Sequence, residues 1–285
     1  MRGGRVAPAV TVAVLTAASA TGCGHGSPRG LVVTGTPPAS PYAGPLYLPT
    51  RNTGGTGPGP LRPASGTAGR PLECDAEIFD GSGPDAWSAA DGGDTPEEGL
   101  AHYFDMVQPQ EPARGYRVEA RSADRVPHSF DEAGRAKVAV VVARDQKDRP
   151  GRGPETDASC DPAELPARYA AAWGWEVWTD GRGGRLPVAR ISGSAGSAHC
   201  DRQSVRLLRL DGRTYARDPE GVLGRDGLLR APYRGDARMP ATAHDTGYHH
   251  GDRRLWLTDD PDTVYVRTSH GVEAWPRTRE AAGCD

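Results

Sequence analysis

The side chains that could perform catalysis are spread over several short stretches of the sequence. Ser194 lies in the stretch Ser-Gly-Ser-Ala-Gly and shortly precedes His199. A serine activated by a histidine is the nucleophile of many hydrolases, but such pairs are defined by their geometry in space and not by closeness along the chain. We therefore interpret Ser194 as part of a Gly/Ser connector between strands. The motifs G-x-S-x-G, H-E-x-x-H, S-x-x-K and the glycine-rich phosphate loop do not occur.

Two groups of residues could hold a metal ion. The acidic stretch 80–94 places carboxylates among glycines and offers the hard oxygen ligands that calcium prefers. It lacks the spacing and the terminal glutamate of an EF-hand, so we interpret it as solvated Gly/Asp turns. The second group is His244, Asp245, His249 and His250. Zinc ligands must converge from separate elements, and we interpret this segment as an exposed loop, with no metal or cofactor predicted.

Carboxylates and tryptophans could also form a site for polymer cleavage or sugar binding. The chain has 37 acidic residues, and only the separation of two carboxylates in space would mark a glycosidase pair. Trp173, Trp175, Trp178 and Trp256 could stack on sugar rings. Because Trp173 and Trp175 alternate as the buried side of a strand does, we expect the tryptophans in the core. The sequence therefore predicts no catalytic residues.

Residues 1–23 have the layout of an export signal. Arg2 and Arg5 precede an apolar run, and the segment ends in Ala-Thr-Gly-Cys. The run is shorter than the roughly 20 apolar residues of a membrane-spanning helix and suits a signal peptide. Small residues before Cys23 are typical of a bacterial lipobox, so we predict a lipoprotein signal peptide with Cys23 as the lipid anchor. The alternative is cleavage after Ala20, in an A-x-A pattern, which would release a soluble secreted protein.

Without Cys23 the chain has an even set of cysteines: Cys74, Cys160, Cys200 and Cys284. Disulfides persist in exported proteins, and four cysteines allow three connectivities. If each half of the chain closes on itself, Cys74 pairs with Cys160 and Cys200 with Cys284. An even remainder is a further reason to assign Cys23 to the lipid.

Residues 24–70 are expected to form a disordered tether. They consist mainly of Gly, Pro, Ser and Thr, a composition that buries too little apolar surface to offset the entropy lost on ordering. The stretch 41–48 is less polar and could dock on the folded part. The tether would lift the folded part away from the membrane.

The charge pattern argues against a nucleic-acid partner. The chain carries 34 basic and 37 acidic residues, a net charge of −3, and its only lysines are Lys137 and Lys147. No basic block with interleaved aromatic residues occurs. Arginine in place of lysine is typical of a GC-rich genome, so we attach no binding role to it.

The first of two expected folded units, residues 71–165, is predicted to be α+β. Thr95, Pro96 and Glu98 form a capping box with proline at the first helical position. The helix that follows has one apolar face: Leu100, Tyr103, Phe104 and Val107. We expect this helix to pack on an antiparallel sheet.

The strands of this sheet follow the helix. Residues 116–121 alternate as a half-buried strand does, and 126–130 with 137–143 form a hairpin whose apolar run 138–142 suits an inner strand. We interpret 147–155, which contains two prolines, as a polar loop. Residues 161–164 resemble a helix start that Pro166 keeps short.

The second unit, residues 166–285, is predicted to be a mostly-β meander. Residues 205–210 and 214–216 flank an Asp-Gly turn and form the clearest hairpin of the chain. Residues 173–177 and 186–191 surround a glycine-rich turn. Further strands are expected at 255–258, 263–267 and 272–275.

Several short motifs together carry a family resemblance. They are His-Cys-Asp-Arg-Gln-Ser at 199–204, Tyr-Ala-Arg-Asp-Pro at 215–219, Asp-Thr-Gly-Tyr at 245–248, Leu-Trp at 255–256, Gly-Cys at 283–284, Cys-Asp at 74–75 and the stretch 94–98. With these motifs the chain resembles a set of actinobacterial secreted proteins and lipoproteins. The resemblance implies a surface lipoprotein and no particular activity, since none is established for that set.

These features predict a lipid-anchored protein on the extracellular face of the cell membrane. Its partners would be the membrane, through the N-terminal lipid, and a component of the cell wall or a surface protein. We favour a non-enzymatic module that binds a ligand or a protein. The alternative is a secreted hydrolase acting on cell-wall or extracellular polymer, which a concave pocket with converging His, Asp or Ser side chains would indicate.

Overall fold

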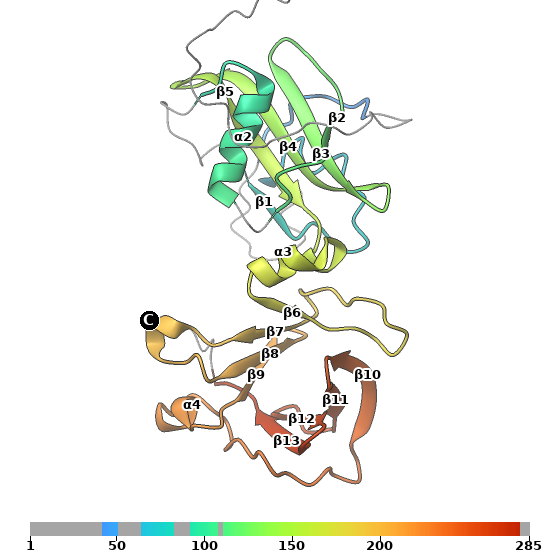
Figure 1. The fold of residues 1–285 in the computed structure, drawn as a ribbon, viewed down its shortest axis with the longest axis vertical. Coiled ribbons are helices and arrows are strands. Elements are labelled where there is room, and N and C mark those ends of the chain that lie inside the picture. Colours follow the sequence, from blue (N-terminus) through green and yellow to red (C-terminus); the bar gives the residue numbers. More distant parts are fainter. Residues whose placement is uncertain (1–41, 51–63, 83–91, 108–110, 280–285) are drawn as a thin grey trace, which may run out of the picture.

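The computed structural model describes residues 42–50, 64–82, 92–107 and 111–279. Antiparallel sheets with few helices make up these residues, which agrees with the predicted α+β class. Figure 1 shows a five-stranded sheet with helix α2 at one end of the molecule and two four-stranded sheets at the other end. Within the described residues no helix is long and apolar enough to span a membrane.

The five-stranded sheet has the strand order β1-β5-β4-β3-β2, so β4 is its central strand. Its members are β1 (Asp80–Ser82), β2 (Tyr116–Val118), β3 (Arg125–Glu132), β4 (Arg135–Gln146) and β5 (Arg149–Ser159). Strands β3 and β4 form the predicted hairpin. The apolar run 138–142 is fully buried in β4, which confirms the inner strand.

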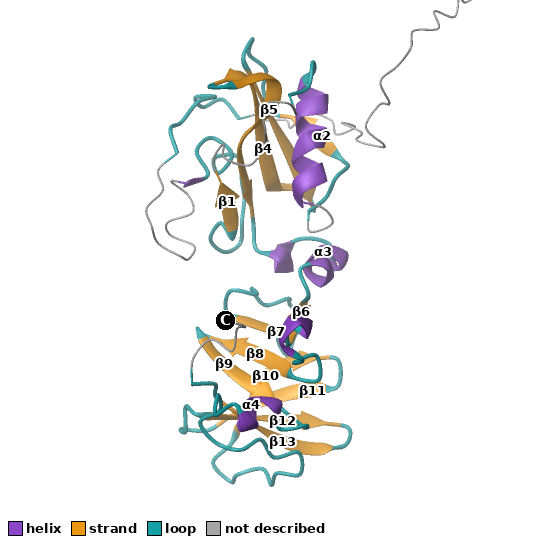
Figure 2. Cartoon of the chain, turned by 90° about the vertical axis from the view of Figure 1, so that its left-hand side faces the viewer, coloured by secondary structure: helices purple, strands orange, loops and turns teal. Residues whose placement is uncertain are grey.

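Helix α2 (Pro96–Val107) covers one face of this sheet, as Figure 2 shows. The capping box is formed: Thr95 Oγ1 accepts a hydrogen bond from the Glu98 backbone amide at 3.1 Å, and Glu98 accepts one from the Thr95 amide. The apolar face of the helix, with Leu100, Tyr103 and Phe104, packs on the valines of β4. Local capping and apolar spacing thus suffice to explain this element.

The opposite face of the sheet is covered by the chain that precedes β1. Ala68, Leu72 and Ile78 are buried against the small side chains of β4 and β5. The prediction of a tether through residue 70 is therefore wrong for 64–70, because Ala, Ser and Thr pack closely on an apolar sheet face although their composition suggests a linker. Arg117 of β2 and the following Glu119 are also buried and ion-paired with each other, so this segment is not the half-buried strand we expected.

Residues 149–155 belong to strand β5 and do not form the polar loop that we expected. Only Lys147 and Asp148 turn the chain, and Asp148 adopts a left-handed conformation with φ of 61°. Strand β5 tolerates Pro154 because the ladder with β4 shifts register there, so the missing amide costs little pairing.

The second half of the chain forms two four-stranded meanders, with orders β6-β7-β8-β9 and β10-β11-β12-β13. The first contains β6 (Trp175–Val177), β7 (Ile191–Ala195), β8 (Arg206–Leu210) and β9 (Arg213–Arg217). The second contains β10 (His244–His250), β11 (Arg253–Leu257), β12 (Thr263–Thr268) and β13 (Gly271–Pro276). Short helices η3 (Ala198–Cys200) and α4 (Val222–Arg225) lie between the strands. A shared core that includes Trp178, Leu208 and Trp275 lies between the two sheets.

Two segments of this half differ from our expectations. The Gly/Ser stretch around Ser194 is strand β7 and not a connector, because small residues fit a strand paired on both sides by β6 and β8. The histidine-rich segment 244–250 is strand β10 and not an exposed loop, and it pairs with β11 across a bulge. Hydrogen bonding to neighbouring strands, which hydrophobic periodicity does not report, defines both segments.

The two halves meet around η2 (Pro162–Glu164) and α3 (Ala167–Ala172), which lie between them in Figures 1 and 2. Buried Asp161 accepts hydrogen bonds from the backbone amides of Val188 at 3.0 Å and Ala189 at 3.2 Å. Phe79 contacts Trp175 edge to face, with ring centroids 4.9 Å apart. Polar and aromatic contacts therefore fix the second half on the first.

Candidate binding groove

Cys74 and Cys160 form a disulfide, the pairing expected for a first unit that closes on itself. The bond joins the segment before β1 to the end of β5, with the Cα atoms 5.3 Å apart. A persistent disulfide of this kind is typical of an extracellular or otherwise oxidising compartment. Cys200 is also disulfide-bonded. Cys23 and Cys284 lie outside the described residues.

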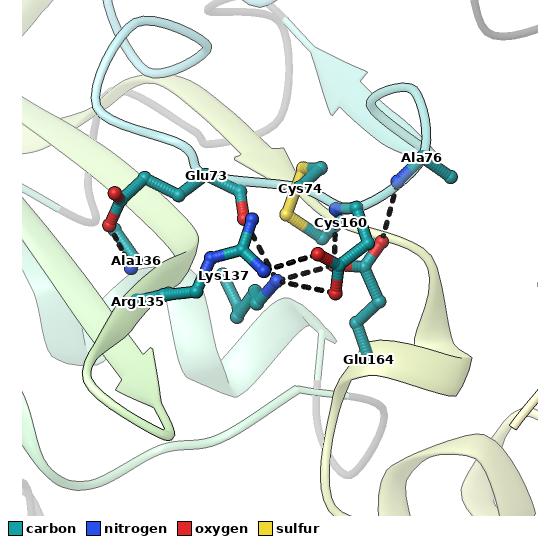
Figure 3. Close-up of a disulfide and its surroundings, with 9 residues drawn as sticks. Glu73, Cys74, Ala76, Arg135, Ala136, Lys137, Cys160 and Glu164 are labelled. Carbon is teal, nitrogen blue, oxygen red and sulfur yellow. Dashed lines mark hydrogen bonds and ion pairs between the residues drawn. A yellow bond between two sulfur atoms is a disulfide. The ribbon is translucent and has the colours of Figure 1, made fainter. Parts of the chain in front are cut away.

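A charged cluster adjoins the disulfide, as Figure 3 shows. Lys137 is almost fully buried, and its Nζ donates to Glu164 at 2.5 Å and to the Glu73 carbonyl at 2.8 Å. Glu164 also accepts the backbone amides of Asp75 and Ala76. These groups satisfy one another, so the cluster fixes the chain around the disulfide and offers no reactive side chain.

The structure does not bring the other candidate residues together. Ser194 and His199 lie on β7 and η3, and within the described ranges no hydrogen bond joins them. His250 Nδ1 is 2.8 Å from the Val177 carbonyl and so connects β10 to β6. His249 Nε2 is 3.0 Å from Thr179 Oγ1, in the segment that follows β6.

The candidate metal and sugar sites are likewise not assembled within the described residues. Part of the acidic stretch 80–94 lies outside the described residues, and no group of three His, Cys, Asp or Glu side chains elsewhere in the described chain could hold a metal. Trp178 is buried as expected, whereas Trp173 is 38% exposed. The tryptophans therefore form no continuous sugar-binding face.

A groove of about 500 Å³ lies instead at the tip of the β4–β5 hairpin. One wall is Tyr47, Leu48 and Thr50 of the segment 42–50. The rim is formed by five side chains of the hairpin tip: Arg144, Asp145, Gln146, Lys147 and Arg149. Arg125 of β3 with Glu155 and Thr156 of β5 completes the lining. Three segments distant in sequence thus converge on one concave surface.

Bulges in the β4–β5 ladder direct these side chains into the groove. Thr156 pairs with Val141 and Pro154 with Val142, which leaves Glu155 as an extra residue on β5. An extra residue interrupts the alternation of a strand, so neighbouring side chains can lie on the same side. This explains how both Glu155 and Thr156 line the groove.

A second irregularity shapes the rim. The register shifts again between Arg144 and Gln146, and Asp145 between them has a φ of 48°. The Asp145 carboxylate accepts the Gly151 amide at 3.1 Å, and the Gln146 side chain donates to the Gly153 carbonyl at 3.0 Å. These bonds hold the tip in a defined conformation, as a binding surface requires.

The wall formed by 42–50 is anchored by close packing. A Cβ atom on Gly66 would lie 2.9 Å from the Leu48 carbonyl oxygen and 3.0 Å from a methyl group of Thr156, and Gly66 has a φ of 51°. Only glycine meets both demands without strain. At the other end of the segment, the Tyr42 amide lies 3.4 Å from an oxygen of Glu119. Docking of 41–48, expected from its lower polarity, thus holds for its described part.

Arg125 organises the inside of the groove. It donates two hydrogen bonds to Glu155, at 2.9 and 2.8 Å, and its guanidinium lies 4.6 Å from the centroid of the Tyr47 ring. Hydrogen bonding to Glu155 raises the pKa of Arg125 above its ordinary value. The Tyr47 side chain nevertheless stays 56% exposed. The groove therefore presents an aromatic ring held in place by a cation.

The chemistry of this lining is suited to binding. Both oxygens of Glu155 accept from Arg125, so this carboxylate is poorly placed to take up a proton from a substrate. Sequence reasoning missed the groove because it depends on bulges and on packing between distant segments. The only available signal was the lower polarity of 41–48.

Comparison of the chain with protein-family models, with curated proteins and with solved structures finds no significant match.

Proposed function

We propose that the protein is a binding module of the cell envelope, held on the extracellular face of the membrane by a lipid on Cys23. The groove carries this proposal, because it is concave, has a defined shape and presents an exposed aromatic ring beside charged groups. The lipobox-like leader and the disulfide agree with export.

The position of the wall relative to Cys23 supports a role near the membrane. Tyr42 begins the described part of the wall and follows Cys23 by 19 residues. A fully extended chain of this length spans at most about 65 Å. An acylated Cys23 would therefore keep Tyr42, at the start of the wall segment, within this distance of the bilayer, in the zone of head groups and membrane-proximal wall polymer.

Anchoring can be tested by detergent phase separation of cells that express the full chain or its Cys23→Ala variant. We expect the full chain in the detergent phase, with fatty acid on its N-terminus by intact mass. Cys23→Ala should partition into the aqueous phase. An unmodified N-terminus at Thr21 in the membrane fraction would disprove lipid anchoring.

Binding can be tested by sedimentation of the mature chain, with Cys23→Ser to remove the lipid, with isolated cell envelopes. Tyr47→Ala should reduce the bound fraction at least about fivefold, since it removes the exposed wall of the groove. Trp173→Ala is the matched control, because it removes another exposed aromatic ring outside the groove. Equal binding of both variants and the parent would exclude the groove as the binding site.

A further inference from the structure

The side chains that line the groove carry an excess of positive charge. The cations are Arg125, Arg144, Lys147 and Arg149, and the carboxylates are Asp145 and Glu155. Their sum is an excess of two positive charges on a chain whose net charge is −3. A net charge of one sign in a concave site raises the local concentration of ligands of the opposite sign.

The inner carboxylate is neutralised within the groove. Glu155 receives both hydrogen bonds from Arg125, and only 12% of its side chain is exposed. A two-pronged pair of this kind is the strong form of a charged hydrogen bond. An incoming anion would therefore meet a neutral pair at the base and not an unpaired negative charge.

The second carboxylate of the lining, Asp145, is paired as well. Asp145 Oδ2 lies 3.0 Å from Arg144 Nε, and Oδ1 accepts the Gly151 amide. This pair is exposed and contributes little attraction of its own. Both lining carboxylates are therefore paired with arginines, and Lys147, which is exposed to solvent, supplies positive charge at the rim.

Polar and aromatic groups lie next to these cations. Thr156 is 3% exposed, and its Oγ1 has no hydrogen-bond partner within the described chain. Tyr47, which lines the same groove, offers the exposed part of its ring. A ligand that combines an oxyanion with hydroxyl groups would use both features, because hydroxyls can satisfy a buried threonine and sugar or polyol carbons pack on an aromatic ring.

We infer that the groove binds an oxyanion, a phosphate or carboxylate, carried on a saccharide or polyol. This inference rests on the proposed function and names the ligand class of the same site. Lys147 at the rim attracts the anion, and Tyr47 and Thr156 contact the saccharide or polyol that carries it. A phosphodiester of this kind occurs both in lipid head groups and in polyol-phosphate polymers, which present the same chemistry.

The test is calorimetric titration of the mature Cys23→Ser chain with glycerol 3-phosphate and, separately, with glycerol. We expect binding of the phosphate ester alone, weakened as salt rises from about 20 to about 200 mM. Lys147→Glu should weaken binding about tenfold, because an attractive charge becomes repulsive. Arg254→Glu, an exposed site on β11, changes the net charge equally and should leave affinity within about twofold.

Two results would overturn the inference: glycerol that binds as tightly as its phosphate, or equal effects of Lys147→Glu and Arg254→Glu. If binding to envelopes still depends on Tyr47 in that case, the proposed function stands and only the ligand class is wrong.

Where the inference holds, titration with dihexanoyl phosphatidylglycerol below its micelle concentration and with a soluble poly(glycerol phosphate) identifies the source of the ligand. Tighter binding of the former indicates a head group, and of the latter a wall polymer.

Discussion

The Nζ atom of Lys137 lies 2.5 Å from a carboxylate oxygen of Glu164, and both side chains are over nine-tenths buried. This pair connects central strand β4 to helix η2, directly beside the Cys74–Cys160 disulfide. A buried ion pair costs desolvation free energy. Removal of one partner therefore destabilises the protein more than the net contribution of the pair suggests, because the other charge is left buried and unpaired. The pair thus holds one end of the five-stranded sheet in place.

Lys137→Met should destabilise the protein by about 3–5 kcal/mol, because Glu164 is then left buried without its cation. Urea unfolding measures the loss. Adding Glu164→Gln should recover part of it, so the two changes are non-additive. Arg135→Ala is the control, since its pair with Asp75 is largely exposed and should cost at most about 1 kcal/mol. Additive losses would contradict the pairing.

Replacement of both Cys74 and Cys160 by Ala should lower the free energy of unfolding by about 4–5 kcal/mol. The two cysteines are 86 positions apart, and a crosslink that closes a loop of this length restricts the unfolded chain to that extent in the chain-entropy model. Chemical unfolding of parent and variant without reductant measures the difference. A loss below about 1 kcal/mol would show that the crosslink does not stabilise the folded state.

Glu111 should make the protein less stable as pH rises. Burial raises the pKa of Glu111 from 4.5 to about 8, and Tyr103 Oη donates to it at 2.6 Å. Between these pH values the folded state keeps a proton that the unfolded state releases. The contribution is therefore fully present below pH 4.5 and is lost through pH 8, at about 1.4 kcal/mol per pH unit.

Glu111→Gln should remove this slope, because glutamine keeps the neutral shape. Relative to the parent, the variant should gain about 4 kcal/mol between pH 5 and pH 8 in urea unfolding. Glu77→Gln removes an exposed carboxylate and is the matched control. A constant difference between parent and Glu111→Gln across this range would show that Glu111 does not hold the proton.

His128 should act in the opposite direction. Its ring is fully buried on β3. Burial lowers the pKa of His128 from 6.5 to about 4. The unfolded chain therefore gains a proton first as pH falls, and stability is lost from pH 6.5 towards pH 4.

His128→Leu should remove that loss, with a gain over the parent of about 2 kcal/mol between pH 6.5 and pH 4.5. The control is His270→Leu at the exposed β12–β13 turn. Between pH 4.5 and 6.5 the slopes of Glu111 and His128 oppose each other, so the two groups together contribute little pH dependence there. A His128→Leu profile parallel to that of the parent would contradict this assignment.

Local sequence determined the elements whose signals are contained in a few consecutive residues. The capping box at Thr95 begins α2, the apolar run 138–142 forms the inner strand β4, and the Asp211-Gly212 turn joins β8 to β9. Each depends on backbone preference or on short-range periodicity. For this reason the α+β class and the hairpins β3–β4 and β8–β9 follow from the sequence alone.

Tertiary structure alone decided the groove and two of the strands, β5 and β10. Strand β5 contains Pro150 and Pro154, and β10 is rich in histidine, so neither has the apolar alternation of a strand. Both exist because neighbouring strands supply hydrogen bonds. The Tyr47 wall exists because Gly66 admits the Leu48 carbonyl at close range. Contacts between residues far apart in the chain leave no local pattern, which is the physical reason that the sequence did not reveal them.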